Sequence, residues 1–249
     1  MREPAPNFAL GLTSVNLGVP DYAQALDQHH AYCDALTQSG LQVIKLPADD
    51  RYPDSTFVED TAVVTERGAI ITRPGATSRA GEVDSISREL SHLFAVQRIT
   101  EPGTLDGGDV CEADEHFFIG ISKRTNEAGA RQLADYLAKL DYTSSLIDIR
   151  KLDSILHLKS GLAYLGKRRL AVIDALIDPR EFEGYELFAV PAGEEYAANC
   201  LNINDRMYIA AGFPNFQERL KGLGYETIAL QMSEFRKMDG GLSCLSIRF

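Results

Sequence analysis

The chain has 249 residues, of which 45% are hydrophobic and 24% charged, and its formal net charge at pH 7 is −11. This composition is typical of a globular protein with a substantial core and excludes a disordered chain. The acidic balance disfavours a nucleic-acid partner, which would require a basic face, and it is compatible with a small cationic substrate. We therefore expect one folded domain over residues 1–249.

The four cysteines are widely spaced and form no C-x-x-C pair, which argues against a disulfide framework and against a zinc site. Free thiols favour a reducing compartment. No apolar run approaches the roughly 18 residues of a spanning helix, and residues 1–6 lack the apolar core of a signal peptide. We expect a cytoplasmic protein with no membrane partner and no bound metal.

The predicted elements begin with a strand at residues 8–14, a helix at 21–40 and a strand at 41–46. Four hairpins follow, each made of two apolar runs joined by a short polar turn. The paired runs are 57–64 with 69–72, 109–112 with 116–121, 161–165 with 169–173, and 199–203 with 207–211.

A helical pattern and a further apolar run follow three of the four hairpins. These segments are 81–94 with 96–99, 126–140 with 144–149, and 214–222 with 227–230. After the third hairpin the sequence Asp178-Pro179-Arg180 interrupts the pattern, so any helix there is brief.

The hairpins recur at intervals of 42 to 52 residues (57 to 105, 105 to 157, 157 to 199 and 199 to 243), which indicates a repeated supersecondary unit. Residues 244–249 predict a last strand with no successor. Pairing this strand with the N-terminal strand would close a ring of five ββαβ-like units, an α/β propeller. An open α/β sheet with helices on its faces explains the pattern equally well.

A closed ring would bring the first residues of its units together around one axis. A thiol, an imidazole and several carboxylates occupy these positions: Glu59, Asp60, Asp106, Asp109, His157, Asn199 and Cys244. Such a set is suited to nucleophilic catalysis by cysteine on a cationic substrate. Each residue alone has a structural alternative, since a cysteine or histidine in an apolar run is usually part of the core.

Six motifs follow one another in a recognisable order: FVED at residues 57–60, TRPGATSR at 72–79, LDGGDV at 105–110, GISKRTN at 120–126, LHLKS at 156–160 and DGGLSC at 239–244. They resemble the successive motifs of the dimethylarginine dimethylaminohydrolases, and the resemblance runs from about residue 41 to the C-terminal end. The resemblance implies a five-bladed α/β propeller of the guanidino-modifying superfamily. It also implies hydrolysis of Nω-methylated arginines to citrulline and an alkylamine, without a cofactor.

Related arginine deiminases and amidinotransferases carry an acidic residue after H-[LI], where this chain has Lys159. Two alternatives stay open. The same thiol chemistry would act on unmethylated arginine or another guanidino compound, or the fold would serve as a catalytically silent binding module. A homodimer is also compatible with the sequence.

The resemblance assigns a role to each matching residue. Cys244 would be the nucleophile, His157 the proton carrier and Asp106 the carboxylate that orients the histidine, in preference to Asp109. The residues that would contact substrate are Asp60 at the guanidinium with Asp54 and Glu59 beside it, Arg79 and Arg124 at the α-carboxylate, Ser160, the backbone of Met238 and Asp239, and Leu17 in an N-terminal flap.

Overall fold

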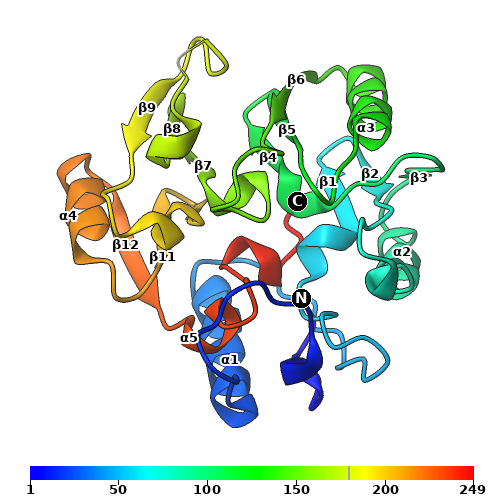
Figure 1. Ribbon diagram of the computed structural model, residues 1–249, viewed down its shortest axis with the longest axis horizontal. Helices are drawn as coiled ribbons and strands as arrows, with labels where there is room; N and C mark the ends of the chain where they lie inside the picture. The colour runs from blue at the N-terminus through cyan, green and yellow to red at the C-terminus, as the bar shows by residue number, and fades with distance from the viewer. Residues whose placement is uncertain (179) are drawn as a thin grey trace.

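The computed structural model describes residues 1–178 and 180–249. In these residues twelve strands form four separate three-stranded sheets (Figure 1). Each sheet is an antiparallel hairpin with a parallel third strand. The strands are β1 (Ala62–Thr65), β2 (Gly68–Ile71) and β3 (Val96–Arg98); β4 (Val110–Ala113), β5 (His116–Ile121) and β6 (Thr143–Asp148); β7 (Leu162–Gly166), β8 (Arg169–Val172) and β9 (Glu186–Ala189); and β10 (Leu201–Ile203), β11 (Arg206–Ala210) and β12 (Glu226–Leu230).

The four predicted hairpins and the four predicted helices are confirmed, with shifted ends. The helices are α1 (Tyr22–Gln38), α2 (Val83–Leu90), α3 (Glu127–Lys139) and α4 (Pro214–Gly222), and a short α5 (Ser233–Arg236) follows β12. Asp21 and Asn126 cap α1 and α3 by accepting bonds from backbone N–H groups three residues on. In the third unit a single turn, η6 (Asp174–Leu176), takes the place of a helix before Pro179, which lies outside the described residues.

The predicted pairing of the two terminal strands is wrong. The first segment forms a 3₁₀ turn, η1 (Phe8–Leu10), and the last begins with another, η8 (Ser243–Leu245), without a ladder after it. In residues 41–46 only Leu46 pairs, in a parallel bridge with Arg2. Phe8 packs its ring against two others, with centroids 5.8 Å from Phe57 and 5.5 Å from Phe235, and this aromatic cluster holds the segment away from any sheet edge.

Five short 3₁₀ turns meet at the centre of the arrangement. They are η2 (Val58–Thr61), η4 (Gly107–Asp109), η5 (Leu158–Ser160), η7 (Glu195–Ala198) and η8. The turn η2 packs against η4 and η8, η4 against η5, and η5 against η7. Hydrogen bonds between Asn199, which follows η7, and Ser243 of η8 complete a closed ring.

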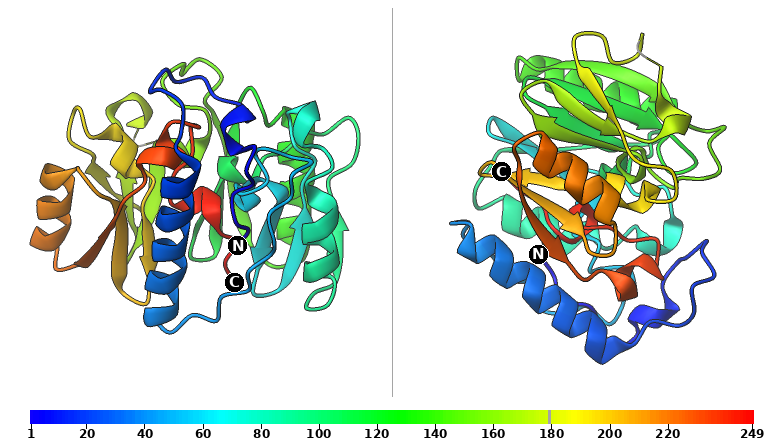
Figure 2. Two further views of the ribbon diagram at one scale, coloured as in Figure 1. Left: turned by 90° about the horizontal axis from the view of Figure 1, so that it is seen from below. Right: turned by 90° about the vertical axis from the view of Figure 1, so that its left-hand side faces the viewer.

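The ring is tight because one of its residues has no side chain. A Cβ on Gly107 would overlap the backbone carbonyl of Glu59, so only glycine allows η4 to approach η2 this closely. The sheets lie around this ring, and the segments at the two ends of the chain fill the remaining sector with α1 on its outer side (Figures 1 and 2). The polar first residues of the units are thereby buried together.

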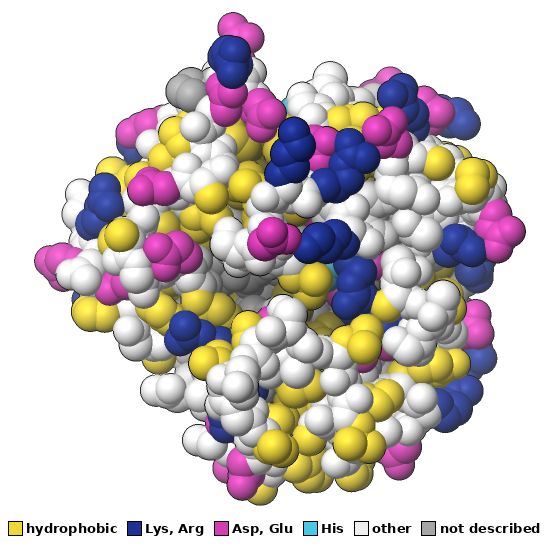
Figure 3. Space-filling view, in the orientation of Figure 1, with side chains coloured by type: hydrophobic (Ala, Val, Ile, Leu, Met, Phe, Trp, Pro, Cys, Tyr) yellow, Lys and Arg dark blue, Asp and Glu magenta, His cyan; other side chains and the backbone are white. Residues whose placement is uncertain are grey.

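Within the described ranges no helix is both long and apolar enough to cross a membrane. On the face in Figure 3, acidic side chains are scattered, and several basic side chains gather near the middle.

Candidate active site

The turns η4 and η5 bring an imidazole and a carboxylate into contact. His157 Nε2 lies 3.0 Å from Asp106 Oδ2, and the two residues are 7% and 0% exposed. The other Asp106 oxygen accepts a 2.8 Å hydrogen bond from the Gly75 N–H, which fixes the carboxylate plane. This is the imidazole–carboxylate contact expected from the sequence, and it involves Asp106 rather than Asp109.

Asp109 is used differently. Its Oδ1 accepts the Leu158 N–H at 2.9 Å and its Oδ2 accepts the Ser122 hydroxyl at 2.6 Å, so it holds the backbone beside His157. Burial raises the pKa of Asp109 to about 6, an effect that His157 and Ser122 partly offset.

Asp60 completes the cluster from η2. Its Oδ1 accepts the Gly108 N–H at 2.9 Å, and its Oδ2 pairs with Arg79 Nη1 at 2.5 Å. Gly108 is required here, because a Cβ would lie 2.8 Å from both Asp60 Oδ1 and His157 Nδ1.

The charges of the cluster reinforce one another. Burial alone would lower the pKa of His157, but Asp60, Asp109 and Asp106 outweigh it and raise that pKa to about 9. Burial also opposes ionisation of Asp60, yet His157 and Arg79 lower its pKa to about 2. At neutral pH the cluster therefore holds an imidazolium among carboxylates.

Cys244 lies in η8 beside a cavity of about 570 Å³. The thiol is half-buried, and its Sγ accepts the Gly241 N–H at 3.4 Å. Burial, and then the charges of Glu59 and Asp60, raise the pKa of Cys244 to about 12. Asp60 therefore acts electrostatically on both the thiol and the imidazole, and the resting thiol is protonated.

Two predicted contacts line the same cavity as Cys244, Leu17 from the N-terminal segment and Ser160 from η5. Asp54 and Asp239 hold the N-terminal segment over the site. Asp54 accepts the Leu12 N–H at 3.0 Å, and Asp239 Oδ2 accepts both the N–H and the hydroxyl of Ser14.

Asp239, which also lines the cavity, adopts a φ of 57°, and Met238 beside it is buried. Asp239 is thus placed at the cavity, whereas Met238 is not among the residues that line it.

The two predicted arginines have different environments. Arg79 is 5% exposed, and its guanidinium donates to Asp60, to Glu82 and to the Phe57 carbonyl. Most of its donors are thereby occupied. Arg124 Nη1 lies 4.0 Å from Asp106 Oδ2 and is a buried nitrogen without a hydrogen-bond partner in the described residues.

Glu59 is placed apart from the other predicted contacts. Its carboxylate accepts bonds from Lys159 Nζ at 2.6 Å and from the Ser243 hydroxyl at 2.7 Å, and it lines a second cavity.

Asp60, Asp106 and His157 offer donor atoms within 4.8 Å of one another, a spacing that a metal ion could use. Arg79 already neutralises Asp60, backbone N–H groups bond the Oδ1 atoms of Asp60 and Asp106, and His157 bonds Asp106 Oδ2. We therefore interpret the three residues as an acid–base cluster.

Two residues near the site were not predicted. Tyr196 lines the Cys244 cavity, donates its hydroxyl to the Gly240 carbonyl at 2.7 Å and lies beneath the Arg236 guanidinium. Glu82 pairs with Arg79. The spacing of Arg79 and Glu82, three residues apart, is a signal that could have revealed the second; Tyr196 lies in a short segment without any motif.

A thiol at a cavity and a buried imidazole–carboxylate pair are the reactive groups of cysteine hydrolases. Comparisons with known proteins identify the family. A family model described as "N,N dimethylarginine dimethylhydrolase, eukaryotic" matches residues 21–184. The N(G),N(G)-dimethylarginine dimethylaminohydrolase of Pseudomonas aeruginosa is 45% identical over 100% of this chain and 97% of its own. The corresponding protein of Streptomyces coelicolor is 36% identical over 100% and 95%. The chain belongs to the dimethylarginine dimethylaminohydrolase family.

Solved structures agree. A cysteine-to-serine variant of the Pseudomonas aeruginosa enzyme, complexed with citrulline, matches with a TM-score of 0.95 at 44% identity, covering 100% of this chain and 97% of that one. The N-terminal domain of a cyanobacterial arginine dihydrolase matches with a TM-score of 0.88 and covers 100% and 95%. At 17% identity the latter shows a shared α/β fold alone.

Proposed function

We propose that this protein hydrolyses Nω-methylated arginines to citrulline and dimethylamine or methylamine, through a covalent intermediate on Cys244. The observation that carries the proposal is the position of Asp60, whose carboxylate lies within 4.8 Å of donor atoms of His157 and Asp106 and whose charge also acts on the Cys244 thiol. A guanidinium bound to that carboxylate would lie beside the nucleophile and the acid.

Substrate recognition would rely on charge at both ends of the molecule. Asp60 would hold the guanidinium and keep it protonated and electrophilic. Arg124, whose Nη1 has no hydrogen-bond partner among the described residues, would hold the α-carboxylate, because a planar donor fork suits a carboxylate. Arg79 would join it only through the donors that Asp60 and Glu82 leave free, and its present contacts support a role in orienting Asp60.

The first chemical step requires a thiolate. The pKa of Cys244, about 12, keeps the free enzyme in the thiol form, and a bound cation would lower that pKa and release the proton to solvent. The thiolate would then attack the guanidino carbon. The C–N bond to the alkylated nitrogen breaks, and the carbon stays attached to Sγ as an S-alkylthiouronium.

His157 would supply and recover the proton. As an imidazolium with a pKa of about 9 it can protonate the departing amine, and the resulting neutral imidazole can take a proton from water. The hydroxide adds to the thiouronium carbon, the C–S bond breaks, and the hydroxyl proton passes to the departing thiolate, so that citrulline leaves and the thiol is restored. No cofactor enters these steps.

We further propose that the four sheets and the sector formed by the chain termini are the blades of one five-bladed propeller domain over residues 1–249. The ring of five central turns supports this arrangement. The free cysteines support a cytoplasmic location, and a homodimer stays a prediction.

Incubation with asymmetric dimethylarginine and, separately, with arginine tests the function, with citrulline and the released amine both assayed. We expect citrulline and dimethylamine from the purified protein and neither from Cys244→Ser. Citrulline with ammonia, formed only from arginine, would favour a deiminase. Absence of product from both substrates would contradict the proposal.

A further inference from the structure

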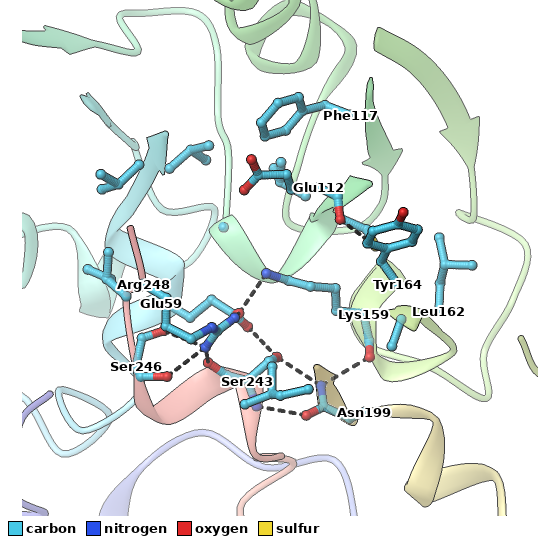
Figure 4. A pocket seen from close by; sticks show the side chains of 18 of the residues that line it. Glu59, Glu112, Phe117, Lys159, Leu162, Tyr164, Asn199, Ser243, Ser246 and Arg248 are labelled. Atoms are coloured by element: carbon cyan, nitrogen blue, oxygen red, sulfur yellow. Dashed lines mark hydrogen bonds and ion pairs between the residues drawn. The ribbon is translucent and has the colours of Figure 1, made fainter. Parts of the chain in front are cut away.

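A second cavity lies on the other side of the central turns from the Cys244 cavity. It measures about 390 Å³ and is lined by Glu59, Lys159, Ser243 and Arg248, among others (Figure 4). Asn199 lines both cavities, so the ring of turns forms the wall between them. Ser243, the residue next to the proposed nucleophile Cys244, therefore faces a polar cavity that the substrate is not expected to enter.

A continuous hydrogen-bond network holds Ser243 in place. Lys159 Nζ donates to Glu59 Oε1 at 2.6 Å, and the Ser243 hydroxyl donates to Glu59 Oε2 at 2.7 Å. Asn199 makes two further hydrogen bonds to Ser243. Its Nδ2 donates to the hydroxyl at 3.0 Å, and its Oδ1 accepts the Ser243 N–H at 2.9 Å. Dashed lines in Figure 4 mark these contacts.

The network is buried, with Glu59 4% and Ser243 2% exposed. A buried carboxylate without a counter-charge is costly, so Lys159 is required to neutralise Glu59. Arg248 lies farther away, with its Nη2 at 3.8 Å from Glu59 Oε1. Loss of Lys159 would leave a negative charge beside the Cys244 turn.

Several charged or titratable groups act on the thiol. Glu59 and Asp60 of η2 oppose thiolate formation, whereas Lys159 of η5 and the Gly241 N–H favour it. Tyr196, within η7, also faces Cys244, and the Arg236 guanidinium covers the tyrosine ring. Of these groups, only Glu59 and Lys159 are bonded to each other and linked through Ser243 to the turn that carries the thiol.

We propose that Glu59 and Lys159 are positioning residues, which fix the nucleophile's turn and set the charge around the Cys244 thiol from the side opposite the substrate. This inference deepens the proposed function and rests on it for the role of Cys244. It also changes the expectation for Glu59, from a substrate contact to a support of the catalytic turn.

Alkylation of Cys244 by iodoacetamide, followed by mass spectrometry at a fixed pH of about 8, tests the pair without any substrate. Well below the thiol pKa the rate is proportional to the thiolate fraction, so a shift of one unit changes it about tenfold. We expect Lys159→Met to slow alkylation about tenfold and Glu59→Gln, which retains an oxygen for Ser243, to accelerate it about tenfold. The double variant should return close to the original rate, and Lys159→Arg should preserve it.

The opposite effects of Lys159→Met and Glu59→Gln on the alkylation rate distinguish this role from a merely structural one. If both single variants slow alkylation equally, or if neither changes it, the proposal is overturned. Lys123→Met provides a matched control, because Lys123 pairs with Asp153 on the exposed surface. Thermal unfolding followed by circular dichroism checks that the variants fold. If Glu59→Gln is unstable, the alkylation rates of Lys159→Met and Lys159→Arg test the proposal by themselves, because only the first should be slower.

Turnover of dimethylarginine provides a separate readout. In Lys159→Met we expect kcat at neutral pH to fall about tenfold with little change in KM, and the loss to shrink as pH rises. Because alkylation needs no substrate, failure of the proposed function would leave the alkylation result unaffected. A change in KM alone would contradict a role at the thiol.

Discussion

The environment of His157 differs strongly from that of an ordinary surface histidine. It is buried, and three carboxylates, Asp60, Asp106 and Asp109, act on it. Desolvation and carboxylate attraction oppose each other, and the attraction is the larger, because the pKa rises to about 9. The site therefore stores a proton at neutral pH, which suits an acid that must serve an amine leaving group.

Replacement of Asp106 tests whether the carboxylates keep His157 protonated at neutral pH. Asp106→Asn removes the charge bonded to Nε2 but retains the shape of the side chain, so the pKa of His157 should fall below about 9. The acidic form would then be lost at lower pH, and the alkaline limb of the kcat profile should move to lower pH. We expect kcat to fall by about 10² to 10⁴. An NMR titration of the imidazole and steady-state citrulline formation measure the two effects.

Asp153→Asn serves as the control, since Asp153 lies on the surface, where it pairs with exposed Lys123. If Asp106→Asn left both the imidazole titration and kcat unchanged, Asp106 would not be the orienting carboxylate.

At the scale of single residues the sequence predicted identities better than contacts. The motifs that resemble those of the family singled out Asp106, His157 and Cys244, and the structure places Asp106 against His157 and Cys244 at a cavity. The direction of neighbouring side chains was not accessible. Glu59 and Asp60 are consecutive, yet Asp60 contacts the His157 cluster and Glu59 lines the second cavity.

At the scale of elements, the N-terminal segment around residues 11–17 has no sheet partner and is held by polar contacts. Leu12 bonds to Asp54, Ser14 bonds to Asp239, and the Thr13 hydroxyl donates to the Lys237 carbonyl. Leu17, 49% exposed, extends from this segment to the Cys244 cavity. A segment held by so few contacts can open at low cost, as a cover over a substrate site must.

Asp239→Gly removes the side chain that binds Ser14 without straining the backbone, because glycine tolerates the φ of 57° at this position. Loss of the Ser14 contacts should raise KM for dimethylarginine about tenfold and leave kcat within about twofold, since roughly 1.4 kcal/mol of hydrogen bonding corresponds to a factor of ten. Steady-state kinetics and limited proteolysis of residues 11–17 measure the change.

Asp141→Gly is the matched control, an exposed aspartate with a φ of 60° beyond α3. A lower kcat with unchanged KM in Asp239→Gly would show that the anchor serves the chemistry rather than substrate retention.

The sequence located the repeated hairpins and helices because apolar periodicity and capping residues act locally. It failed at the chain ends, where position depends on distant partners. Phe8 packs in an aromatic cluster with Phe57 and Phe235, and no local sequence pattern distinguishes this packing from that of a strand residue. The start of the first predicted strand, residues 57–61, was also wrong, because Val58–Thr61 forms a buried 3₁₀ turn.

At the scale of the whole molecule, closure of the central ring depends on the contact between Asn199 and Ser243, which joins the last unit to the chain's end. Gly241 makes this contact possible. A Cβ at that position would lie 2.5 Å from both Cγ and Oδ1 of Asn199, closer than atoms can approach without displacement. Asn199 also donates to the Lys159 carbonyl, so its displacement would disturb three of the five turns.

Gly241→Ala should therefore destabilise the fold and inactivate the site together. We expect a loss of about 2 kcal/mol or more in the free energy of unfolding, from overpacking and broken buried hydrogen bonds. Urea denaturation gives this value, and Cys244 alkylation reports the turn. Gly222→Ala is the control, since Gly222 ends α4 with open space around it and alanine there favours the helix by up to about 1 kcal/mol. If the two variants were equally stable and Cys244 kept its reactivity, the ring would not depend on this contact.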